Sequence, residues 1–92
     1  MAHFVQALVA APLDQKQELL TILMEECAEL AIEASKVIRF GYEQSDRLES
    51  EAGDVLCMIQ LLQDYGLVNL DNVHLCAEAK REKLKQWSNL NV

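Results

Sequence analysis

The sequence predicts an all-α protein: an antiparallel helical bundle of about three main helices plus a short N-terminal segment. Residues that favour helices (Leu, Ala, Glu, Gln and Lys) are abundant, and three glycines and one proline leave few interruptions. Apolar residues recur every three or four positions in three long segments, while the β-branched runs typical of strands are missing. For 92 residues we expect one domain, residues 1–92.

The first elements are an apolar segment, residues 1–13, and a helix predicted over residues 14–40. Asp14 is a good N-cap with Gln17 at the capping-box position, and Gly41 is suited to end the helix. The helical period predicts an apolar stripe made of Leu20, Leu23, Cys27, Leu30, Ala34 and Val37.

A second helix is predicted over residues 46–65, with Ser45 or Asp46 as its cap and Gly66 as its stop. Its apolar stripe consists of Leu48, Ala52, Val55, Ile59 and Leu62. Gly53 interrupts this pattern at a cost of roughly 1 kcal/mol relative to Ala. It fits a close helix approach or ligand access, and chance explains it equally well.

The third helix is predicted over residues 72–87, with Asn69 or Asp71 as its cap. Its apolar side consists of Val73, Cys76, Ala77, Leu84 and Trp87. Because the connections between the three helices are short, neighbouring helices should pack antiparallel. Trp87 is expected in the core, with stacking on a base as the alternative.

The net charge of -7 argues against a nucleic-acid polymer as partner, because such surfaces need a basic stripe. The apolar start has no basic n-region and is too short to span a bilayer, so we expect a soluble, cytoplasmic protein with no membrane partner. The cysteines form no Cys-x-x-Cys or His/Cys cluster, which favours three reduced core thiols over a zinc site: Cys27, Cys57 and Cys76.

Two carboxylate pairs at helical spacing are the most informative feature of the chain. Glu26 and Glu29 lie on one helix face, and Glu51 and Asp54 lie on one face of the next helix. If the two helices pack antiparallel, the pairs face each other. Either pair alone is better explained as a solvated acidic surface. Together, with Glu25, Glu33 and only Lys36 as a basic helical partner, they indicate a site that a divalent cation neutralises.

The types of ligand indicate which metal this site would take. Neither pair contains a histidine, because His3 and His74 lie elsewhere, which argues against a di-iron site. Carboxylates alone suit Mg²⁺, with Mn²⁺ as the second choice. Lys80 and Lys83, one turn apart on the third helix, fit a phosphate-binding role, and helix-dipole complementation with surface solubility explains them equally well.

The order Glu25-Glu26-x-x-Glu29, 21 intervening residues and Glu51-x-x-Asp54 resembles the signature of the MazG-like all-α nucleoside triphosphate pyrophosphohydrolases. The resemblance covers residues 17–87, and the small size is similar to compact members from phages and mobile elements. It implies cleavage of a nucleoside triphosphate between the α and β phosphates, releasing a monophosphate and pyrophosphate.

By matching position, the resemblance implies roles for seven residues. The Mg²⁺ ligands would be Glu26, Glu29, Glu51 and Asp54, with Glu25 orienting or deprotonating the attacking water, and with Lys80 and Lys83 neutralising the phosphates. Members of this family build their sites between protomers, so a homodimer or homotetramer is expected. The Asn and Arg that often follow the family's Lys have no clear match in Leu84–Trp87.

Two other functions compete with this enzyme. One is a catalytically idle relative that uses the same bundle as a binding or regulatory module, and the presence of all four acids argues against it. The other is an oligomeric helical interaction protein with an acidic face. Replacing Glu51 by Gln separates this interaction protein from the enzyme. The change would abolish turnover in the enzyme and be harmless or even stabilising in the interaction protein.

Overall fold

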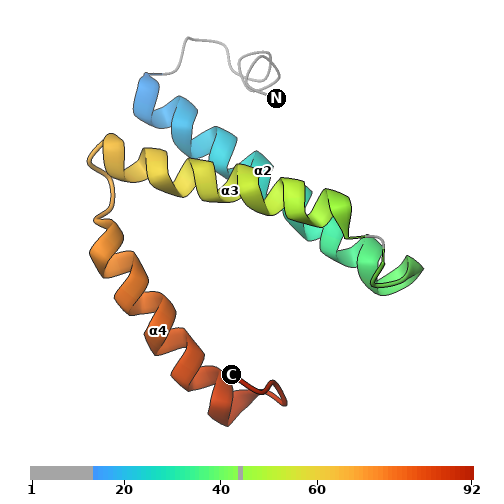
Figure 1. Cartoon of the computed structure of the whole chain (residues 1–92). Helices are drawn as coiled ribbons and strands as arrows, with labels where there is room; N and C mark the ends of the chain where they lie inside the picture. The colour runs from blue at the N-terminus through green and yellow to red at the C-terminus, as the bar shows by residue number, and fades with distance from the viewer. Residues whose placement is uncertain (1–13, 44) are drawn as a thin grey trace.

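The computed structural model describes residues 14–43 and 45–92, which form three helices and no strand: α2 (Gln15–Phe40), α3 (Asp46–Asp64) and α4 (Leu70–Trp87). Figure 1 shows that α2 and α3 lie side by side and run in opposite directions. The all-α class and the three main helices are therefore confirmed. The predicted apolar segment, residues 1–13, lies outside the described residues.

Helix α2 has the ends that its sequence predicts. The Asp14 side chain accepts a hydrogen bond from the Gln17 backbone N–H at 2.8 Å, and the Asp14 backbone N–H donates to Gln17 Oε1 at 3.2 Å. This reciprocal pair is a capping box. At the other end Gly41 adopts a φ of 118°, which side chains with a Cβ disfavour. Its N–H donates to the Val37 carbonyl at 3.0 Å and ends the helix.

Helices α3 and α4 are joined by a short turn around Gly66, whose φ is 76°. Asn69 is the cap of α4, because its side chain accepts hydrogen bonds from the backbone N–H groups of Asp71 and Asn72. The helix consequently begins at Leu70, two residues before the expected start. The Leu70 N–H also donates to Gln63 Oε1 at 2.8 Å, which ties the start of α4 to the end of α3.

Helix α4 extends away from the α2–α3 hairpin (Figure 1) and contains no buried residue. Its predicted apolar side is therefore not buried against the other described helices. Trp87 is 83% exposed, so the expectation of a core tryptophan is wrong for the single chain. Within a chain, the antiparallel bundle consists of α2 and α3.

The apolar core lies at one end of the hairpin, where the start of α2 meets the end of α3. Leu19, Met58 and Leu62 are buried there, and the partly buried residues around them are Ile22, Leu23, Leu61 and Val68. This small core fixes how α2 and α3 meet and hence which residues face each other farther along the hairpin.

The face of α2 that meets α3 matches the predicted apolar stripe only in part: Val37 is buried and Leu23 packs against the core, as predicted. Leu20 and Cys27 are exposed, whereas the buried residues of α2 are Leu19, Glu26, Glu33 and Val37. Two apolar faces adjoin on this helix, and the periodicity does not distinguish which one meets the neighbour. All three cysteines are free, but they are exposed, so the expectation of core thiols is wrong.

Candidate metal centre

The carboxylates of two helices meet in the middle of the α2–α3 hairpin. One oxygen each from Glu26, Glu51 and Asp54 lies within 4.8 Å of the other two. Glu26 comes from α2, and the other two come from successive turns of α3. The antiparallel packing thus places the two predicted acidic pairs opposite each other.

Some oxygens of these acids are removed from water without gaining a hydrogen-bond partner. Glu26 is 7% exposed. One side-chain oxygen of each of three residues is buried and has no hydrogen-bond partner in the described part of the chain: Oε2 of Glu25, Glu26 and Glu51. Burying a polar atom without a partner costs free energy. Such oxygens are available to coordinate a cation.

The electrostatics of the cluster agree with its geometry. Burial raises the pKa of Glu26 above its ordinary value, and the carboxylates of Glu29, Asp54 and Glu25 raise it further. Burial is also the first cause of the raised pKa of Glu51, followed by the charges of Glu29, Asp54 and Glu26 and by a hydrogen bond to Glu29. The five residues in these two sets therefore share one electrostatic site.

Each predicted acid has a definite place in this site. Glu26, Glu51 and Asp54 form the compact group, Glu29 lies next to Glu51, and Glu25 borders Glu26. Several converging carboxylate oxygens, some of them without hydrogen bonds, fit a hard divalent cation such as Mg²⁺ or Mn²⁺. The residues present therefore suit the metal that the sequence indicates.

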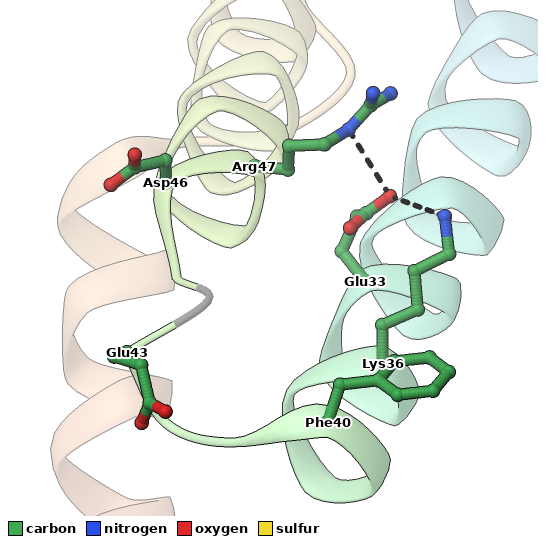
Figure 2. A pocket seen from close by; sticks show the side chains of 6 residues that line it. All are labelled: Glu33, Lys36, Phe40, Glu43, Asp46 and Arg47. Atoms are coloured by element: carbon green, nitrogen blue, oxygen red, sulfur yellow. Dashed lines mark hydrogen bonds and ion pairs between the residues drawn. The ribbon is translucent and has the colours of Figure 1, made fainter.

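A second charged group lies beside the acids, towards the α2–α3 connection. Glu33 is 6% exposed, and its Oε1 lies 3.2 Å from Lys36 Nζ and 3.4 Å from Arg47 Nε. Figure 2 shows Lys36 on the same helix as Glu33 and Arg47 reaching across from α3. Unlike the acids of the metal centre, this buried carboxylate is neutralised by protein cations.

Arg47 was not identified from the sequence. The available signal was its position four residues before Glu51, which places both residues on one face of α3. In the antiparallel register Arg47 faces Glu33, as Glu51 faces Glu29. Recognising Arg47 needed this register as well as the helical period.

Lys80 and Lys83 do not join the acidic cluster within one chain. Both are exposed residues of α4, which leads away from α2 and α3 (Figure 1). The only ion pair among the described residues of α4 joins Lys85 Nζ to Glu82 Oε1 at 2.8 Å. A phosphate-binding role for Lys80 and Lys83 stays a prediction.

Comparison with known proteins places the chain in a family. The family model described as the MazG nucleotide pyrophosphohydrolase domain matches residues 14–86, which is most of the chain. The chain belongs to this family. No curated protein and no solved structure gave a significant match. No helix among the described residues combines the length and apolar character needed to cross a membrane.

Proposed function

We propose that this protein is a metal-dependent nucleotide pyrophosphohydrolase that cleaves an NTP or dNTP between the α and β phosphates. The products are the corresponding monophosphate and pyrophosphate. Membership of the MazG family supports this general activity. The observation that carries the proposal is the convergence of Glu26, Glu51 and Asp54, with unpartnered oxygens on two of them.

The proposed ligands of Mg²⁺, or of Mn²⁺, are Glu26, Glu29, Glu51 and Asp54. A bound divalent cation would offset their charge, polarise a phosphoryl oxygen and make water a better nucleophile. Other residues of the chain would act on the attacking water. Glu25 adjoins Glu26 and has a buried, unpartnered oxygen, which supports the proposal that it orients the attacking water or accepts its proton.

We propose that the working protein is a homodimer or homotetramer located in the cytoplasm. The core of one chain is small, and α4 buries nothing. Large apolar side chains are exposed on all three helices, including Met24, Ile32, Ile38, Leu56, Leu75 and Trp87. A second copy is the occupant that would cover these faces, because short chains gain stability by association. It would also allow Lys80 and Lys83 to reach a partner's acids.

Pyrophosphate release from a panel of NTPs and dNTPs, with and without Mg²⁺ or Mn²⁺, tests the activity. We expect release from at least one nucleotide only when metal is present. Light scattering coupled to size-exclusion chromatography tests the assembly in parallel. A folded oligomer that cleaves no member of the panel would contradict the enzyme and favour a binding or regulatory module with the same fold.

A further inference from the structure

We infer that Arg47, held in place by Glu33, is a phosphate-binding residue at the edge of the carboxylate centre. This inference rests on the proposed function and adds the group that would receive the substrate's negative charge. It starts from a count of charges at Glu33. One buried carboxylate has two cations on the same oxygen, Lys36 from its own helix and Arg47 from α3. The group therefore carries one positive charge more than neutrality requires.

The guanidinium of Arg47 is anchored by one end only. Its Nε faces Glu33, and in the described part of the chain neither terminal nitrogen has a hydrogen-bond or ion-pair partner. Figure 2 shows these two nitrogens on the side facing away from the carboxylate. The side chain is 76% exposed, so its free donors are open to a ligand. A guanidinium fork matches the geometry of two phosphate oxygens.

The position of Arg47 connects this fork to the metal centre. A surface cavity of about 260 Å³ is lined by Arg47 and Glu33 together with the metal-centre acids Glu29 and Glu51 and with Ile32. A phosphate chain bound through a cation at the acids would continue towards the Arg47 end of this cavity. Arg47 and Glu33 also line a second cavity, of about 340 Å³, near the α2–α3 connection (Figure 2), and Lys36 lines this second cavity but not the first.

Salt bridging alone does not explain this arrangement. Lys36 already neutralises Glu33, and a mostly exposed arginine adds little stability through an ion pair. Binding to Glu33 does, however, limit the orientations of the guanidinium. An arginine oriented before the ligand arrives loses less conformational entropy when it binds phosphate.

The test measures binding as well as turnover. Isothermal titration calorimetry of inorganic triphosphate, with Mg²⁺ present, should show binding to the wild-type protein. Arg47→Gln should weaken it about tenfold or more, the effect of one lost charge-assisted hydrogen bond. The triphosphate affinity of Arg47→Lys should lie between the affinities of the wild type and Arg47→Gln. The matched control is Lys36→Gln, which removes the other cation on Glu33 and should leave triphosphate affinity within about twofold.

The outcomes separate this inference from the proposed function. Equal triphosphate affinity in wild type and Arg47→Gln would overturn the inference, even if the enzyme is active. No triphosphate binding to the wild type would also overturn it. Arg47-dependent binding without hydrolysis of any nucleotide would uphold the inference and reject the enzyme. Circular dichroism spectra like that of the wild type exclude unfolding as the cause of lost affinity.

Discussion

Glu29 of α2 and Glu51 of α3 meet across the hairpin, close enough for a hydrogen bond between their carboxyl groups. Two carboxyl groups can share such a bond only when one of them carries a proton. Burial and the surrounding carboxylates raise the pKa of Glu51 and thereby favour its protonated form. Binding of a divalent cation by Glu51 would need its ionised form and would therefore release its proton.

The first prediction is that Glu51→Gln abolishes pyrophosphate release while the helical circular dichroism spectrum is unchanged. Without metal, the variant should melt at a higher temperature than the wild type at neutral pH, because one of several crowded negative charges is gone. Glu49→Gln, an exposed change in the same helix, should alter neither property. Substantial turnover by Glu51→Gln would exclude Glu51 from the site.

A second prediction concerns pH. The pKa values of Glu26 and Glu51 are raised above their ordinary 4.5, so between 4.5 and the raised values the folded chain binds more protons than the unfolded chain. In this window the two groups make the free energy of unfolding fall as pH rises. Metal binding opposes this effect, so the gain in Tm on adding Mg²⁺ should be larger at neutral pH than at pH 4.5.

Differential scanning fluorimetry across this pH range, with EDTA or with Mg²⁺, measures both effects. The double variant Glu26→Gln, Glu51→Gln is the control, because neither group can titrate. The Tm of the metal-free wild type, measured relative to the Tm of this variant, should fall as pH rises. A gain in Tm from Mg²⁺ that is equal at both ends of the range would contradict the coupling.

The third prediction is that Gly53→Ala stabilises the single chain by about 0.5–1 kcal/mol, the usual gain at an exposed helix interior. A Cβ added at Gly53 meets no atom within 4 Å in the described structure, so no close approach of α2 to α3 requires the glycine. Urea unfolding measures the change. A loss of stability that depends on protein concentration would instead show that Gly53 packs against a second copy.

Fourth, Leu62→Ala should destabilise the protein by about 2–4 kcal/mol, because it removes a buried side chain from the only apolar cluster of the described residues. Gln60→Ala is the control on the same helix. This residue is exposed, so its replacement should change the free energy of unfolding by less than about 0.5 kcal/mol. Similar effects in the two variants would mean that the cluster is not the core.

The fifth prediction tests whether protomers share a site. Chains carrying Glu51→Gln and chains carrying Lys80→Ala with Lys83→Ala should each be inactive alone. After the two are unfolded together and refolded, mixed oligomers should recover activity, because one site combines intact acids with the partner's intact lysines. Refolding each variant by itself is the control. Activity that stays absent in verified mixed oligomers would place the lysines outside a shared site.

The fold class and the two ends of α2 were accessible from sequence because they depend on local signals. The capping box of Asp14 and Gln17 and the glycine at position 41 act within a few residues of each other. The apolar stripes were less informative. Leu20 and Cys27 obey the helical period but face away from α3, because helical periodicity does not specify which face the next helix covers.

The acids of the candidate site were also found from sequence, since Glu26 and Glu29 on one helix and Glu51 and Asp54 on the next each share a face. The contribution of Arg47 depends on which turn of α3 lies opposite Glu33, and this register is a tertiary property. The position of α4 was not accessible either, because none of its residues is buried in the part of the chain that the structure describes.

The uneven division of the α2–α3 hairpin has a consequence for motion. Its apolar end has the buried cluster of Leu19, Met58 and Leu62, whereas its middle has the converging carboxylates and lies outside this cluster. Local opening is easiest where apolar contacts are few. Backbone amides near the acids should therefore exchange with deuterium faster than those near the cluster, and a cation would slow mainly the fast ones. The part of the hairpin proposed to bind the cation is thus also the part expected to open more easily.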